Sequence, residues 1–149
     1  MSPRKRTIVI LIADDDAEDR MLVKDALEEN RLTNQIQFVE NGEELVDYLH
    51  NRGKFADKDK YQTPGLILLD LNMPKKDGRG ALKEIKADEH LRVLPVVVLT
   101  TSKAEEDILR TYDLGVSSFI TKPVTFSSLV DVMRTLSKYW FEIVEHPKP

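Results

Sequence analysis

The sequence of 149 residues contains no cysteine, so disulfide bonds, thiol catalysis and zinc–thiolate sites are excluded. Near the amino terminus the apolar run from Ile8 to Ala13 covers six residues, which is shorter than a signal-peptide core and too short to cross a bilayer. The chain also has no excess of positive charge: it contains 22 Lys and Arg residues and 26 Asp and Glu residues, which gives a formal net charge of −4. Nucleic-acid binders normally carry a basic face. We therefore expect a cytoplasmic protein with neither a nucleic acid nor a membrane as partner.

The residues that are present have the composition of a globular protein, with 41% hydrophobic and 32% charged residues. The length fits one domain. We expect a solvated basic tail over residues 1–6, a folded domain over residues 7–140 and an extension over residues 141–149.

Short apolar runs alternate with longer amphipathic segments along the whole chain. This alternation predicts an α/β fold in which helices cover both faces of a five-stranded parallel sheet. The predicted strands cover residues 7–13, 35–39, 65–69, 95–99 and 117–120, and the predicted helices cover residues 16–30, 41–52, 79–88, 103–114 and 125–140.

Capping residues and apolar spacing define the predicted helices. Asp16, Asn41 and Thr125 are candidate N-caps. The side chains expected to face the core are Met21, Leu22, Ala26 and Leu27 in the first helix and Phe126, Leu129, Met133, Leu136 and Trp140 in the last. The segment Gly53–Pro64 is polar, charged and bounded by Gly and Pro, which predicts a surface loop.

Charged and hydroxyl side chains follow four of the predicted strands at their carboxyl ends. Asp14 and Asp15 follow the first strand, and Asp70, Thr100 and Lys122 lie at or near the ends of the third, fourth and fifth. Ligands of open α/β sheets bind at this edge. Asp16 is assigned to helix capping and not to this group.

Clustered carboxylates repel one another unless a cation lies among them. Mg²⁺ suits such a cluster, because it is held by one or two carboxylates and keeps positions open for water and phosphate oxygen. A carboxylate such as Asp70 can then act as a nucleophile towards phosphorus. The cation, Lys122 and the Thr100 hydroxyl would supply the positioning and charge neutralisation that phosphoryl transfer needs.

Four stretches, ILIADDD, LILLDLNMPKKDG, VVVLTTS and FITKP, resemble the receiver domain of response regulators in two-component systems. The resemblance covers nearly the whole chain. It implies a flavodoxin-like receiver fold with strand order 2-1-3-4-5. It also implies a phosphoprotein that takes a phosphoryl group from a histidine kinase and switches partner binding or dimerisation, and that is not a turnover enzyme.

The resemblance assigns a metal site to four residues. Asp70 is the phosphoacceptor and a ligand of Mg²⁺ or Mn²⁺, together with Asp15 and the backbone carbonyl of Asn72. Asp14 contributes through a water molecule.

The resemblance also assigns the switch. Thr100 is the switch hydroxyl, Phe119 is the aromatic rotamer switch, and Lys122 contacts the phosphate. Lys122–Pro123 is expected to be a cis peptide. Thr101 departs from the smaller residue that many family members carry, which bears on access to the phosphorylation site.

The interval between Asp15 and Asp70 is longer than in the family pattern, and the Gly53–Pro64 insertion accounts for the difference. A similar insertion occurs in the small response regulators that partner cyanobacterial phytochromes. This likeness implies a phytochrome-type histidine kinase as the partner.

Apolar residues continue beyond the point where a minimal receiver ends. Exposed apolar residues near a terminus indicate an interface, and we expect a homodimer through this segment. The expected interface residues are Tyr139, Trp140, Phe141, Ile143 and Val144. The downstream partner is not identified by the sequence.

Two other functions are possible in principle. An aspartyl-phosphate phosphatase normally has a second Asp two residues after its nucleophile, but Asn72 occupies that position here. A degenerate receiver that serves only as a binding module would not need the site residues, yet all of them are present: Asp14, Asp15, Asp70, Thr100 and Lys122.

Overall fold

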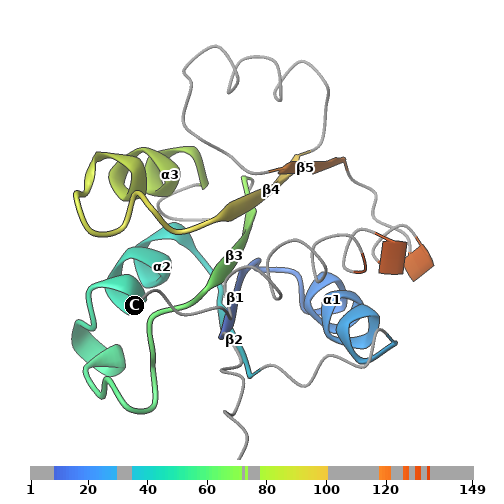
Figure 1. Ribbon diagram of the computed structural model, residues 1–149, viewed down its shortest axis with the longest axis horizontal. Helices are drawn as coiled ribbons and strands as arrows, with labels where there is room; N and C mark the ends of the chain where they lie inside the picture. Colours follow the sequence, from blue (N-terminus) through green and yellow to red (C-terminus); the bar gives the residue numbers. More distant parts are fainter. Residues whose placement is uncertain are drawn as a thin grey trace, which may run out of the picture.

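A five-stranded parallel sheet forms the centre of the chain (Figure 1). The computed structural model describes residues 9–29, 35–71, 73, 78–100, 118–121, 126–127, 130–131 and 134. The strands are β1 Ile10–Ala13, β2 Ile36–Val39, β3 Leu66–Asp70, β4 Val96–Thr100 and β5 Ser118–Thr121, and the helices are α1 Ala17–Glu29, α2 Gly42–Leu49, the 3₁₀ helix η1 Gly53–Phe55 and α3 Gly78–Ala87.

The strands are hydrogen-bonded in the order β2-β1-β3-β4-β5, with every neighbouring pair parallel. This confirms both the α/β class and the expected strand order. Each strand begins and ends within its predicted range or one residue beyond it. The helix predicted over residues 103–114 lies outside the described residues.

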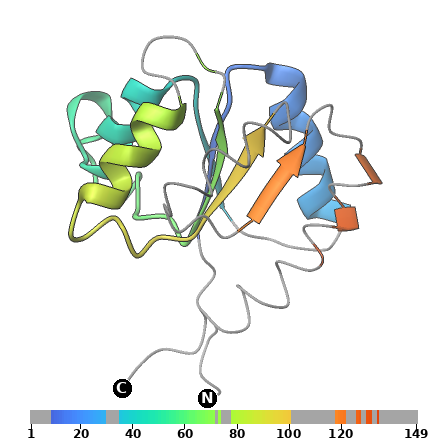
Figure 2. The same cartoon turned by 90° about the horizontal axis from the view of Figure 1, so that it is seen from above.

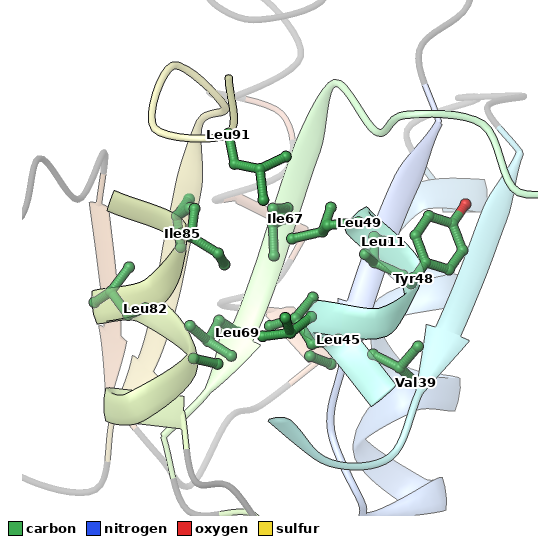
Figure 3. Packing of buried hydrophobic residues seen from close by; sticks show 14 of the residues in the cluster. Leu11, Val39, Leu45, Tyr48, Leu49, Ile67, Leu69, Leu82, Ile85 and Leu91 are labelled. Atoms are coloured by element: carbon green, nitrogen blue, oxygen red, sulfur yellow. The ribbon is translucent and has the colours of Figure 1, made fainter. Parts of the chain in front are cut away.

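The side chains of the central strands pack against helices on both faces of the sheet. Successive residues of a strand point to opposite faces. Leu11, Ile67 and Leu69 therefore pack with α2 and α3 (Figure 3), whereas Ile12 and Leu68 join a second cluster with α1. Figure 2 shows α2 and α3 on one side of the sheet and α1 on the other. Burying such a side chain stabilises the fold by roughly 1.5–3 kcal/mol.

Helix α1 starts where its cap predicts, but one of its predicted core residues is exposed. The Asp16 side chain accepts hydrogen bonds from the backbone N–H groups of Glu18, at 2.8 Å, and Asp19, at 3.3 Å. The prediction that Met21 faces the core is wrong, because its side chain is 51% exposed. Val23 is buried instead, and Met21 lies about 200° around the helix from it.

The last helix is described at five positions, and its prediction is partly wrong. Val130 is buried in the same cluster as the α1 side chains. Phe126, predicted to face the core, is 41% exposed. It lies one turn before Val130, so the described part of the helix is buried at Val130 and exposed in the turn that precedes it.

Helix α2 has the predicted cap and a shorter length than predicted. The Asn41 side chain accepts a hydrogen bond of 2.8 Å from the backbone N–H of Glu44, whose carboxylate accepts one from the N–H of Glu40. The helix ends at Leu49 and not near residue 52. Asn51 adopts a left-handed backbone conformation with φ of 53°, which ends the helical path.

The Gly53–Pro64 insertion contains packed structure and is not simply the surface loop that was predicted. Phe55 is buried, and its ring lies 5.4 Å from that of Tyr48 and 5.1 Å from that of Tyr61. The Asn51 side-chain amide donates hydrogen bonds of 3.0 Å to the carbonyl oxygens of Phe55 and Tyr61. These contacts fasten the insertion to α2.

The Tyr48 hydroxyl adds a polar contact to this aromatic group. It donates a hydrogen bond of 3.0 Å to the carbonyl oxygen of Gln62. Burial raises the pKa of Tyr48 to about 12. The hydroxyl therefore stays protonated, and remains a donor, at neutral pH.

Gly78 lets α3 begin directly against the end of β3. Its backbone N–H donates a hydrogen bond of 3.0 Å to the carbonyl oxygen of Leu71. A Cβ atom at this position would overlap the carbonyl oxygen of Asp70 and lie 2.6 Å from the Cα atom of Leu71. Glycine is required here by space and not by backbone conformation.

Replacement of Phe55 tests whether the insertion is part of the core. We expect Phe55→Ala to lower the free energy of unfolding by about 3–5 kcal/mol, because a buried ring is removed from a packed cluster. Chemical denaturation measures this change. Lys58→Ala, at an exposed position of the same insertion, is the control and should change little. Equal stability of the two variants would contradict a packed insertion.

Replacement of Gly78 tests the close approach of α3 to β3. We expect Gly78→Ala to lower the free energy of unfolding by about 1–3 kcal/mol, because the new methyl group displaces backbone atoms of Asp70 and Leu71. Thermal and urea denaturation measure the change. Alanine is otherwise favoured over glycine in a helix, so a more stable variant would show that the space exists. Lys83→Ala, at an exposed position of α3, controls for substitution in this helix.

Candidate functional site

Three carboxylates meet at the carboxyl edge of the sheet. Asp14 and Asp15 directly follow β1, and Asp70 is the last residue of β3. In the register of this strand pair Ala13 lies opposite Leu69, so the next residues along, Asp14 and Asp70, come side by side. One oxygen from each of the three carboxylates lies within 4.8 Å of the other two. The predicted convergence is therefore present for the three carboxylates.

The three carboxylates differ in exposure. The residues Asp14 and Asp70 are buried, with exposures of 0% and 1%, and Asp15 is exposed. Buried carboxylates at this spacing repel one another in a medium that screens charge poorly. A divalent cation among them would offset the repulsion, and carboxylate oxygens are the donors that hard cations prefer. The donor set therefore fits a hard divalent ion.

Backbone hydrogen bonds hold Asp14 at its place. Its N–H donates to the carbonyl oxygen of Val39 in β2, at 3.0 Å. Its carboxylate accepts a hydrogen bond of 2.9 Å from the N–H of Asp16. Asp16 itself caps α1, as predicted, and does not belong to the carboxylate cluster.

The position of Asp70 is set by the centre of the sheet. It lies opposite Leu99 of β4, and the N–H of the next residue, Leu71, donates to the Leu99 carbonyl oxygen at 3.2 Å. Gly78 of α3 packs against the Asp70 backbone from the other side. The Asp70 carboxylate is thus presented by a backbone that is fixed on two sides.

The predicted switch residues are placed by their backbones. Thr100 ends β4 opposite Thr121 of β5, and Phe119 lies in β5 opposite Val98. Both strands end at the edge that carries the carboxylates. The side chains of Thr100 and Phe119 lie outside the described part of the structure, so the roles of the hydroxyl and the ring stay predictions.

Several predicted residues lie outside the part of the chain that the structure describes. The backbone carbonyl ligand, the residue after the switch threonine, the phosphate-contacting lysine with its cis peptide, and the interface all belong to this group. The residues are Asn72, Thr101, Lys122, Pro123, Tyr139, Trp140, Phe141, Ile143 and Val144.

Arg20 contacts the site although the sequence did not single it out. Its guanidinium donates a hydrogen bond of 2.7 Å to the backbone carbonyl oxygen of Asp14. The same group lies over the ring of Phe38 in β2, 5.7 Å from the ring centre. The available signal was an Arg in the first turn of the helix that follows the acidic cluster. That signal is weak, because every residue has a backbone carbonyl and no sequence spacing identifies which one an Arg will contact.

The described residues show one such cluster and no membrane-spanning element. Within them, no second group of three carboxylate or histidine side chains comes together as closely. None of the helices that the structure describes is both long enough and apolar enough to cross a membrane.

Comparison with known sequences agrees with this geometry. Residues 10–134 match the family model described as the response regulator receiver domain. The response regulator Rcp1 of Synechocystis sp. is 36% identical over 139 residues, which are 93% of this chain and 92% of the relative. A probable methanogenesis regulatory protein, FilR2 of Methanothrix harundinacea, is 36% identical over 143 residues, 95% of this chain and 88% of the relative.

Solved structures lead to the same family. The phosphorylated cyanobacterial phytochrome response regulator RcpA is similar with a TM-score of 0.79 and 38% identity, over 93% of this chain and 96% of that one. The Mn²⁺-bound form of Rcp1 is similar with a TM-score of 0.78 and 35% identity, over 95% and 99%. The acidic cluster and the existence of an Mn²⁺-bound relative together indicate a divalent-metal site. The chain belongs to the response regulator receiver domain family, whose members are signalling proteins phosphorylated by a partner kinase.

Proposed function

We propose that this chain is a signalling switch in which Asp70 accepts a phosphoryl group from a histidine kinase. The observation that carries the proposal is the meeting of Asp14, Asp15 and Asp70 within 4.8 Å at the end of the central strands. A buried carboxylate among other carboxylates can act as a nucleophile when a cation offsets their charge.

The proposed ligands of the cation are the carboxylates of Asp15 and Asp70 and the backbone carbonyl of Asn72, with Asp14 acting through water. The cation would be Mg²⁺ or Mn²⁺. When bound, it neutralises charge on the phosphoryl oxygens and on the cluster. The Mn²⁺-bound relative supports this choice of ion.

In the proposed reaction, an oxygen of Asp70 attacks the phosphorus of a kinase phosphohistidine. The new O–P bond forms as the N–P bond breaks, and the imidazole, which carries a proton on its other ring nitrogen, leaves as a neutral group with the bonding electron pair. Lys122 contacts the phosphoryl oxygens, and Thr100 donates its hydroxyl to one of them. Phe119 then moves into the space that Thr100 vacates, which changes the surface made by the predicted helices over residues 103–114 and 125–140 and by β5 between them. Water later hydrolyses the acyl phosphate.

The partner kinase is proposed to be of the phytochrome type. Two observations support this choice: the similarity to RcpA, a cyanobacterial phytochrome response regulator, and the insertion between α2 and β3. The chain acts on a phosphoryl group delivered by a protein, so we propose a switch and not a turnover enzyme. Its place would be the cytoplasm, and its downstream partner is a separate protein.

The proposed domain division keeps the basic tail over residues 1–6, the receiver over residues 7–140 and the extension over residues 141–149. The family match over residues 10–134 supports the central part. We propose that the extension and the end of the last helix form a homodimer through Tyr139, Trp140, Phe141, Ile143 and Val144.

Phosphorylation by a small donor tests the central proposal. Incubation with acetyl phosphate and Mg²⁺ should add one phosphoryl group per chain, which is lost at alkaline pH because acyl phosphates hydrolyse there. Asp70→Asn and chelation of the metal should each abolish the addition, as read by intact-protein mass spectrometry. Asp16→Asn keeps a good helix cap outside the cluster and should still be phosphorylated. Sustained turnover of a generic phosphomonoester would instead indicate a phosphatase.

Sedimentation velocity tests the proposed dimer. We expect the wild-type chain to sediment as a dimer and Phe141→Glu to sediment as a monomer, because a buried charge without a partner is costly at an apolar interface. Val93→Glu places the same charge on another apolar residue, one that is 75% exposed, and should leave the dimer intact. An unchanged oligomeric state of Phe141→Glu would count against the terminal interface.

A further inference from the structure

Arg20 reaches from α1 back to the end of β1. It is the fourth residue of the helix, and its side chain is half-buried. Its Nη1 atom lies 2.7 Å from the backbone carbonyl oxygen of Asp14, a short and charge-assisted hydrogen bond. The guanidinium is thus attached to the backbone of the carboxylate cluster and not to a carboxylate.

The contacted carbonyl belongs to the peptide that joins Asp14 to Asp15. The N–H of Asp14 is already held by Val39 and its Oδ1 atom by the N–H of Asp16. With its carbonyl also held, the Asp14–Asp15 peptide plane is fixed in direction. This matters for Asp15, because its exposed side chain must be aimed at the cluster by the backbone that carries it.

Phe38 supports the guanidinium from the neighbouring strand. It lies opposite Ile12 in the pairing of β2 with β1, and its ring centre is 5.7 Å from the Arg20 Cζ atom. A planar guanidinium can stack on a ring while it donates in its own plane, which a lysine ammonium cannot do. Arg20 and Phe38 therefore form one unit beside the cluster.

We infer that Arg20, supported by Phe38, is a positioning residue for the divalent-ion site. The inference rests on the proposed function, because it assumes that Asp15 and Asp70 hold an ion. Arg20 contacts a backbone carbonyl of the site and would not be a ligand of the ion. It orients the peptide from which Asp15 projects.

The position of Arg20 and its positive charge have opposite expected effects on the affinity of the site for a divalent cation. The positive charge of Arg20 near the cluster repels a divalent cation, so a loss of that charge alone would strengthen ion binding. Loss of the oriented peptide would weaken binding, since groups that orient metal ligands contribute to metal affinity. The sign of the change in affinity therefore separates a positioning role from an electrostatic one.

The test measures the Kd of Mn²⁺ for the purified chain by water-proton relaxation and calorimetry, without any phosphodonor. We expect Arg20→Ala to weaken binding about 10-fold, the lower end of the range for residues that orient metal ligands. Arg20→Lys keeps the charge but loses the stacked fork, so its Kd should fall between wild type and Arg20→Ala. Phe38→Ala should weaken binding in the same direction, and the double variant should lose less than the two changes combined.

The control removes the same charge elsewhere. Arg52 follows α2, at the opposite edge of the sheet from the cluster, and pairs with Asp47 at 3.3 Å. Arg52→Ala should leave the Kd unchanged. Circular dichroism checks that each variant is folded at the temperature of the titration, and Arg20→Lys provides the milder change should Arg20→Ala not fold.

The outcomes distinguish this inference from the proposed function. If wild type binds Mn²⁺ and Asp15→Asn does not, the ion site stands. An Arg20→Ala variant whose Kd is then equal to or lower than that of wild type overturns the positioning role alone. If wild type itself fails to bind Mn²⁺, the proposed ion site is wrong and the inference falls with it.

Discussion

The parallel pairing of β1 with β3 is the constraint on which the site depends. It sets Ala13 opposite Leu69, and so brings the residues that follow, Asp14 and Asp70, to the same level at the sheet edge. A register shifted by one residue would turn the β3 side chains to the opposite face and separate the carboxylates. The apolar side chains buried on both faces help to fix this register, because a slip of one residue would exchange the two clusters.

The stability of the apolar layers also offsets the unfavourable free energy of the acidic cluster. Two buried carboxylates close to a third are unfavourable for the isolated chain, and repulsion of this kind is tolerated only where the rest of the fold holds the groups in place. Here the backbone is held at Asp14 by β2 and at Asp70 by β4 and α3. The site therefore conflicts locally with stability, as sites prepared for a charged ligand commonly do.

Much of this arrangement could be predicted from the sequence. The strands are continuous apolar runs, so the ends of all five were predicted within one residue, although β1 begins three residues later than predicted, and Asp16 and Asn41 cap their helices by local rules. The strand order came from the family motifs, since apolar runs alone do not say which strands are neighbours. The meeting of Asp15 with Asp70 followed from the two strands ending at one edge.

Other features have no local signature. The spacing of apolar residues in α1 allows either of two faces of the helix to be buried. Packing against the sheet determines which face is buried, and it leaves Met21 exposed. Phe55 lies among charged residues, so composition indicated a loop, although its ring packs against those of Tyr48 and Tyr61. Arg20 binds a carbonyl, a partner that every residue carries, and thus no motif points to it.

The double hydrogen bond of the Asn51 amide ties Phe55 to Tyr61 and closes a short loop on itself. The residues between them, 56–60, are all exposed. Lys60 at its end is held to the sheet, because its carbonyl oxygen accepts a hydrogen bond of 3.0 Å from the Gln37 side chain of β2. The length of residues 56–59 does not set the position of β3, because the two ends of the loop are held to each other before the chain enters that strand. Natural variants could lengthen or shorten it here and leave the carboxylates where they are.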